Sequence, residues 1–120
     1  MVCLMLALVL VVGMAGSAMA ERFYFHFYPP FQGCARETGE AKTTGNPYVD
    51  PDGSSGAIVE TTFELRLGRD DVSNAVRTTG ARRSFSYYDG YGGSGHSYSM
   101  LGAPSRSDFQ EYQANGTWQP

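Results

Sequence analysis

The chain has 120 residues and a formal net charge of −3 at pH 7, with a sequence pI near 5.2. This acidic balance provides no basic surface for nucleic acid or for anionic lipid, so both classes of partner are excluded. A chain of this length has room for one modest hydrophobic core, which excludes two independent domains.

Residues 1–20 are predicted to be a cleavable secretory signal peptide. Residues 2–16 carry no charge and are almost entirely Val, Leu, Met and Ala, and Ala18 and Ala20 provide the small residues that a signal peptidase accepts. The competing interpretation is an uncleaved anchor, because no Lys or Arg precedes the apolar run. That run is at or below the ~20 residues of a bilayer span, and Glu21 ends it. We therefore expect cleavage after Ala20, secretion, and no membrane association afterwards.

Residues 21–120 would then form a single β-rich domain with one cysteine. Cys3 leaves with the signal, so Cys34 has no partner for an internal disulfide. We expect Cys34 to be buried or to pair with another chain, and we expect packing to stabilise the domain.

Residues 22–28 are predicted to form the first strand. Phenylalanines alternate there with tyrosine and histidine at a period of two, which is typical of a strand with one buried face. Pro29 and Pro30 end the strand, because neither can donate to a ladder. The two faces consist of Phe23, Phe25 and Phe27 on one side and Tyr24, His26 and Tyr28 on the other.

Residues 32–56 are predicted to be rich in loops. Gly, Thr, Pro, Asp and Ser dominate the segment, and Asn46-Pro47 and Asp52-Gly53 are turn dipeptides. A short extended piece is expected around residues 48–50.

Residues 58–67 give the clearest strand, because apolar side chains and Thr61 alternate with polar ones up to Gly68. Residues 70–76 are predicted to make one helical turn or a bend. Two further strands are predicted at residues 84–88 and 97–101.

The Gly-rich segment 89–95 suits a hairpin loop between those two strands. Residues 105–114 are predicted to form a short helix ended by Asn115-Gly116, with a strand and turn as the alternative. Long helical periodicity is absent from the sequence, so the predicted class is all-β.

Few side chains are arranged as a reactive site. His26 and His96 have no Cys or carboxylate pair at metal-ligand spacing, so no metal site is expected. The glycines of 90–95 precede a strand and are predicted to be turn residues, not a phosphate-binding loop. Asp50 and Asp52 flank a proline in the loop and are predicted to be solvated.

Asn115-Gly116-Thr117 is a glycosylation sequon, and export would make it usable in a eukaryotic host. A β-turn is the alternative interpretation of the same tripeptide, and both can hold. The eight Tyr and seven Phe residues suit an aromatic-lined cavity, an ordinary small core, or a Tyr/Gly-rich structural protein.

Several short segments of the mature chain match, in the same order, segments of a known protein family. They are Phe23-Tyr24-Phe25-His26, Val49-Asp50-Pro51, Leu67-Gly68-Arg69, Tyr91-Gly92-Gly93-Ser94, Ser99-Met100-Leu101-Gly102, Pro104, Glu111 and Gly116-Thr117. In this collinear arrangement they resemble the dirigent family of secreted plant proteins, which share a calycin-like barrel with allene oxide cyclases.

The chain departs from the family pattern at named positions. Phe27 stands where the family has a pocket Asp, and Ala103 and Gln110 stand where it has Arg. The sequence also stops at Pro120, where family members continue with further strands. We therefore expect a divergent or C-terminally truncated member, whose antiparallel β-barrel is incomplete at the C-terminus.

The resemblance implies a protein of the apoplast, often trimeric, that binds monolignol radicals made by a separate oxidase. It orients their stereoselective coupling in lignan-type phenylpropanoid biosynthesis and has no redox cofactor, so it is a binding scaffold more than a true catalyst. Phe23, Phe25 and Phe27 would line the cavity, and Asp50 would be its matched carboxylate. The alternative is a small extracellular Tyr/Gly-rich structural or interaction protein without ligand chemistry.

Overall fold

The computed structural model describes residues 20–52, 59–93 and 95–120. Residues 1–19 of the predicted signal peptide lie outside these ranges, as does Ile58 at the start of a predicted strand.

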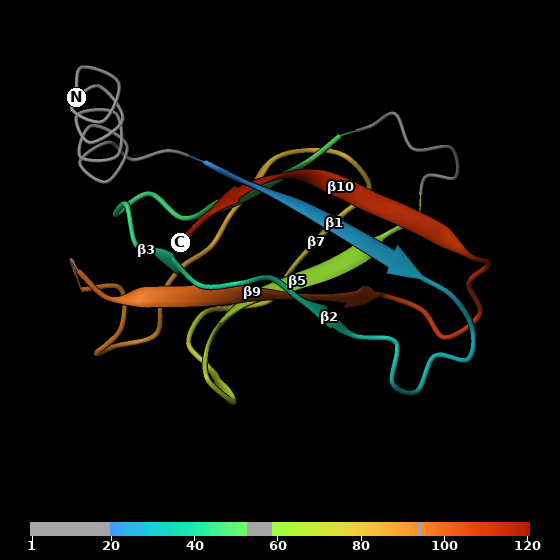
Figure 1. The fold of residues 1–120 in the computed structure, drawn as a ribbon, viewed down its shortest axis with the longest axis horizontal. Coiled ribbons are helices and arrows are strands. Elements are labelled where there is room, and N and C mark those ends of the chain that lie inside the picture. The colour runs from blue at the N-terminus through green and yellow to red at the C-terminus, as the bar shows by residue number, and fades with distance from the viewer. Residues whose placement is uncertain (1–19, 53–58, 94) are drawn as a thin grey trace, which may run out of the picture.

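The described residues contain strands and no helix (Figure 1). Within them, no helix is long and apolar enough to cross a membrane. The strands are β1 (Glu21–Phe27), β2 (Arg36–Glu37), β3 (Ala41–Lys42), β4 (Tyr48–Pro51), β5 (Thr61–Leu67), β6 (Asp70–Asp71), β7 (Val76–Thr78), β8 (Arg83–Ser84), β9 (Ser97–Pro104) and β10 (Tyr112–Gln119).

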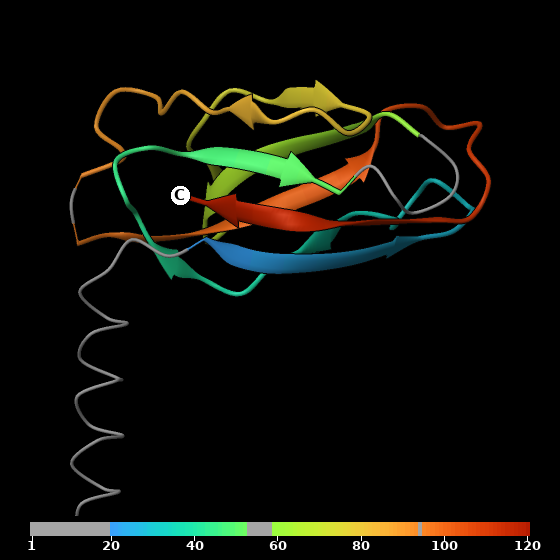
Figure 2. The same cartoon turned by 90° about the horizontal axis from the view of Figure 1, so that it is seen from above.

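The first sheet has the order β1-β10-β4-β8. All of its strand pairs are antiparallel, and the register places Tyr24 opposite Asn115 and Trp118 opposite Val49. Figure 2 shows β4, β10 and β1 in succession. The last described strand therefore lies in the middle of this sheet and pairs with the first.

The second sheet has the order β2-β9-β5-β6, with β3 also paired to β9 and β7 to β5. It too is antiparallel, and Phe63 of β5 lies opposite Gly102 of β9. A Cβ atom at Gly102 would lie 2.7 Å from the Phe25 ring. Glycine at this position therefore lets an aromatic side chain of β1 rest on the backbone of β9.

The core lies between the two sheets and is built from alternate residues of the long strands. The Phe23 and Phe63 rings meet across it, with centroids 5.6 Å apart. Burial of such a side chain contributes roughly 1.5–3 kcal/mol. The buried apolar residues are Phe23, Phe25, Phe27, Cys34, Tyr48, Val49, Phe63, Leu65, Val72, Val76, Phe85, Tyr98, Met100, Phe109, Tyr112, Ala114 and Trp118.

The two sheets are joined by backbone hydrogen bonds along one edge. An isolated bridge pairs Ser73 with Tyr87. Beside it, the Asn74 amide donates to the Ser86 carbonyl (3.1 Å) and the Tyr88 amide donates to the Val72 carbonyl (2.9 Å). This backbone connection between the sheets is called the Ser73 seam.

At the opposite edge, β1 and β2 share no ladder in the described residues. A side chain spans the gap, because Arg36 Nε donates to the His26 carbonyl oxygen at 3.2 Å. The described strands thus form two antiparallel sheets and do not close into one hydrogen-bonded barrel. The predicted all-β, antiparallel class is confirmed.

Two predicted elements differ from the structure. Residues 84–88 and 97–101 do not form a hairpin, because β8 pairs with β4 in the first sheet and β9 belongs to the second. The segment between them crosses from one sheet to the other. Residues 105–111 are neither helix nor strand, and the sequon lies inside β10.

Two other segments contain more strand than their composition indicates. The loop-rich segment 32–56 includes β2, β3 and β4. Residues 70–76 form β6, the bridge at Ser73 and the start of β7 instead of the predicted helical turn or bend. The extended piece predicted at 48–50 is present as β4. Cys34 is buried, and its Sγ donates to the Tyr28 carbonyl at 3.5 Å.

Candidate functional site

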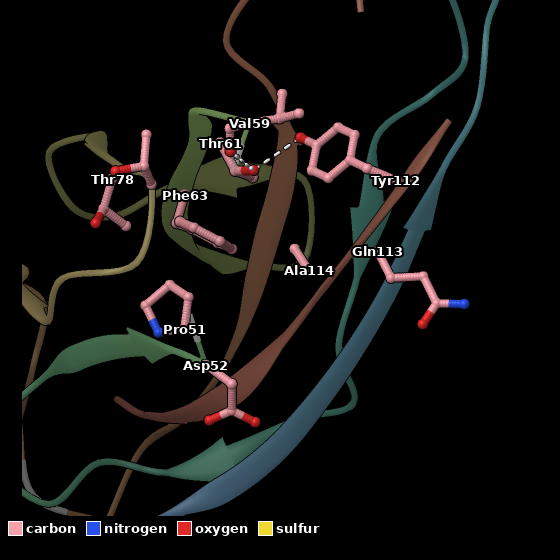
Figure 3. Close-up of a pocket in the computed structure, with 10 residues that line it drawn as sticks. Pro51, Asp52, Val59, Thr61, Phe63, Thr78, Tyr112, Gln113 and Ala114 are labelled. Carbon is pink, nitrogen blue, oxygen red and sulfur yellow. Dashed lines mark hydrogen bonds between the residues drawn. The ribbon is translucent and has the colours of Figure 1, made fainter. Parts of the chain in front are cut away.

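A pocket lies where β4 ends and β5, β7 and β10 come together (Figure 3). We call it the Tyr112 pocket. Its walls carry hydroxyl groups and rings, together with one carboxylate. The lining residues are Pro51, Asp52, Val59, Thr61, Phe63, Thr78, Thr79, Tyr112, Gln113 and Ala114.

The centre of the Tyr112 pocket is a pair of buried hydroxyl groups. Thr61 Oγ1 and the Tyr112 hydroxyl are 2.7 Å apart. Thr61 Oγ1 also donates to the Val59 carbonyl at 3.3 Å. Because a threonine hydroxyl has one proton to donate, Tyr112 donates to Thr61.

Burial raises the pKa of Tyr112 to about 12, against a smaller lowering effect of its hydrogen bond with Thr61. The phenol therefore stays protonated at neutral pH. It can donate one hydrogen bond and accept another, but it does not act as a base.

Aromatic rings form the inner wall of the pocket. Phe63 is fully buried, and its ring stacks with that of Phe25 at a centroid distance of 6.4 Å. The Tyr112 ring lies 5.1 Å from that of Phe27. The space left at the centre is about 20 Å³, which is room for about one water molecule.

The carboxylate at the rim is engaged elsewhere. Asp52 Oδ2 accepts a hydrogen bond from Arg22 at 2.7 Å, and Figure 3 shows the Asp52 carboxylate well away from the Tyr112–Thr61 pair. The Tyr112 pocket thus offers hydrogen bonds and apolar ring surface, without a buried acid and base to act on a substrate.

The three phenylalanines predicted to line a cavity all face the interior. Phe23, Phe25 and Phe27 are at most 4% exposed, and their side chains form one continuous row with ring centroids 5.2 Å and 5.8 Å apart. Phe27 reaches the Tyr112 ring, so this row leads from the core to the pocket. Their role as ligand contacts stays a prediction.

Asp50 lies on the opposite face of the same sheet. Val49 and Pro51 point into the core, so the side chain between them points outward, where Arg82 donates to Asp50 Oδ2 at 3.1 Å. The residues predicted as a ligand site are therefore divided between the interior and the outer surface.

The histidines and carboxylates are dispersed. His26 Nε2 lies 3.3 Å from Glu111 Oε2 on the surface. Among residues 20–52, 59–93 and 95–120, no group of three or more His, Cys, Asp or Glu side chains is placed to hold a metal ion.

Sequence reasoning did not find Tyr112, Thr61 and Thr78 as pocket residues. Tyr112 lies in the segment 105–114, for which the sequence leaves a helix and a strand with a turn open, so its place on β10 is not evident. The alternation of Tyr112, Ala114, Gly116 and Trp118 is the period-two signal that would have placed Tyr112 on the inner face.

Comparison with known proteins gives no matching family model, no matching curated protein and no matching solved structure.

Proposed function

We propose that this chain is a secreted, dirigent-like protein of the apoplast. It binds monolignol radicals and orients their stereoselective coupling, with the radicals supplied by a separate oxidase and no redox centre of its own. The fold would be an open form of the calycin-like barrel, joined at the Ser73 seam and assembled as a homo-oligomer, a trimer by the resemblance.

The observation that supports this proposal is the composition of the Tyr112 pocket. A phenolic ligand has an aromatic ring and a hydroxyl, and the pocket presents the Phe63 ring beside the Tyr112–Thr61 hydroxyl pair. The ring would stack on aromatic surface at offset or edge geometry. The ligand hydroxyl would accept from Tyr112 in place of Thr61.

The small volume of the pocket sets a condition on this binding. About 20 Å³ does not hold a phenylpropanoid, so the ligand must displace the Tyr112 ring toward the rim. Holding two radicals in one relative orientation requires only positioning, because radical coupling itself has little barrier to lower.

The test is coupling of coniferyl alcohol by a one-electron oxidant in the presence of purified protein, followed by chiral chromatography of the dimers. We expect an enantiomeric excess that increases with protein concentration and falls in Tyr112→Ala. Tyr88→Ala, which removes an exposed tyrosine outside the pocket lining, is the matched control and should retain the excess. Racemic products at saturating protein would overturn the proposal.

The second candidate is an extracellular structural or interaction protein without ligand chemistry. The specific observation in its favour is that aromatic side chains fill the interior. An NMR titration with coniferyl alcohol separates the two candidates. Shifts at Thr61, Phe63 and Tyr112 favour the binding scaffold, and an unchanged spectrum favours the structural protein.

A further inference from the structure

The sequon Asn115-Gly116-Thr117 lies within β10, in the middle of the first sheet. Ala114 and Trp118 on the same strand are buried in the core. Strand alternation therefore places Asn115 and Thr117 on the outer face. Both are partly exposed there.

The backbone at the sequon is fully engaged. Asn115 pairs with Tyr24 of β1 on one side, and on the other its carbonyl accepts from the Asp52 amide at 2.7 Å. Its side-chain amide makes no hydrogen bond with another residue of the described ranges. Within those ranges, no partner occupies the nitrogen to which a sugar would be attached.

An exposed aromatic ring lies directly across from Asn115. Tyr24 is 71% exposed, the most exposed of the large apolar side chains in the described residues. Side chains directly opposite in an antiparallel pair have Cβ atoms about 4.5–5.5 Å apart. On its own strand, the Arg22 guanidinium carbon lies 5.6 Å from the ring centroid.

We propose that Asn115 carries an N-linked glycan and that the first sugar of this glycan packs on the Tyr24 ring. The inference rests on the export that belongs to the proposed function. What it adds is the contact between the first sugar and the Tyr24 ring. A pyranose has an apolar C–H face that can cover a tyrosine ring otherwise left in water.

The modification is a glycosyl transfer from a lipid-diphosphate-linked oligosaccharide. The Asn115 Nδ2 atom forms a bond to C1 of the first sugar and loses one proton. The bond from C1 to the phosphate oxygen breaks, and the lipid diphosphate leaves with the bonding electrons. No electron transfer and no further reactant are involved.

The position of Asn115 also fixes the order of events. A transferase needs an extended, accessible sequon, and β10 pairs on both edges in the folded sheet. Transfer therefore precedes pairing of β10, and the sugar meets Tyr24 when the sheet forms. The glycan then covers the outer face of β1 and β10, which is unavailable to a protein partner.

The first experiment is secretion of the full chain from a eukaryotic host, with mass spectrometry before and after peptide-N-glycosidase treatment. We expect one glycan, retained in Thr117→Ser and lost in Thr117→Ala. A second arm replaces residues 1–20 with a signal peptide of the host. Export only in the second arm would contradict the predicted signal, whereas an exported chain without glycan would overturn this inference.

The second experiment tests the contact with Tyr24 by thermal unfolding. Endoglycosidase trimming to the first sugar should leave Tm unchanged. Complete removal, which converts Asn115 to Asp, should lower Tm by about 4 °C to the value of Asn115→Asp made without glycan.

Variants of the ring decide whether Tyr24 provides that shift. Tyr24→Phe should keep the difference between the trimmed and the sugar-free protein, and Tyr24→Ala should abolish it. Tyr28→Ala, which removes an exposed tyrosine one residue past the end of β1, is the matched control and should keep this difference. An equal difference in Tyr24→Ala and in the unaltered chain would overturn the proposed contact.

Discussion

The ionisation of Tyr112 differs from that of a free tyrosine. Its phenol is buried and donates to Thr61, and its pKa is raised to about 12 from an ordinary value of 10.0. The unfolded chain ionises this phenol near pH 10, while the folded chain keeps it neutral. Its contribution to stability is therefore complete below pH 10 and is lost as the pH rises toward 12.

We expect the free energy of unfolding to fall over that pH interval, and phenolate absorbance to show late-ionising tyrosines, because burial raises the pKa of Tyr87 as well as that of Tyr112. Tyr112→Phe should remove one phenol from this late phase. The same variant should lose about 0.5–1.5 kcal/mol at neutral pH, because one hydrogen bond is removed. Unchanged late ionisation in Tyr112→Phe would contradict the assignment.

Glu64 is a second residue with a pH-dependent effect. Burial, followed by the charge and hydrogen bond of Asp71, raises the pKa of Glu64 above its usual 4.5. A carboxyl group whose pKa is higher in the folded chain stabilises the fold at pH values below its unfolded-state pKa. This stabilisation is lost as the pH rises through the folded-state pKa. At neutral pH the ionised pair is therefore destabilising.

Glu64→Gln should increase the free energy of unfolding at pH 7, and its advantage over the unaltered chain should vanish below about pH 4. Urea unfolding at several pH values measures this. Glu40→Gln removes an exposed carboxylate and is the control, so an equal gain in both variants would contradict a role for the Glu64–Asp71 pair.

At the scale of single elements, the contact between β4 and β10 depends on Gly116. A Cβ atom there would lie against the Asp50 carbonyl oxygen and 2.6 Å from Pro51 Cα. Backbone atoms cannot move aside as the end of a side chain can. The two strands approach this closely because residue 116 has no side chain.

Gly116→Ala should therefore cost about 1–3 kcal/mol, the usual range for overpacking, and it leaves the sequon intact. Chemical denaturation measures the loss. Gly39→Ala is the matched control, because its new Cβ would meet no atom within 4 Å and its φ lies outside the left-handed region. Equal stability of the two variants would contradict the close approach.

The aromatic row of β1 depends on Phe63 of β5 across the core. Phe63→Ala should cost about 3–5 kcal/mol, the usual range for removal of a buried ring. Phe31 is 41% exposed, so Phe31→Ala should change stability by about 0.5 kcal/mol or less. A loss in Phe63→Ala as small as that expected for Phe31→Ala would contradict the role of Phe63 in the core.

The strands that alternate cleanly could be predicted from the sequence. Residues 22–28 and 58–67 correspond to β1 and β5, with the predicted residues of β1 and Phe63 and Leu65 of β5 buried. Pairing could not be predicted, because the partner of β8 is set by the path of residues 89–95 and not by local composition. The inner face of β10 alternates as Tyr112, Ala114, Gly116 and Trp118, but glycine weakens this signal. That glycine is required by the close approach of β4.

At the scale of the whole molecule, the two sheets share one core, but the two edges along which they meet are joined differently. The Ser73 seam contains backbone hydrogen bonds, whereas the opposite edge relies on the Arg36 side chain. The candidate pocket could not be predicted from sequence for a related reason. Thr61, Thr78 and Tyr112 come from three strands, and only the packing of both sheets brings them together.

Amide hydrogen exchange tests this difference between the edges. The amides of Asn74 and Tyr88 should exchange only through global unfolding, because both donate within the seam. Arg36→Ala should speed amide exchange around residues 26–36. The amides of Asn74 and Tyr88 should still exchange only through global unfolding in this variant. Fast exchange of Asn74 and Tyr88 in the unaltered chain would contradict the seam.

The pairing of β1 with β10 has a kinetic consequence. Contacts between residues almost a full chain length apart form slowly, because the intervening loop must close first. β10 also separates β1 from β4, so no part of the first sheet beyond β4–β8 can assemble until residues 112–119 have left the ribosome. The first sheet can therefore be completed only when nearly the whole chain has been synthesised.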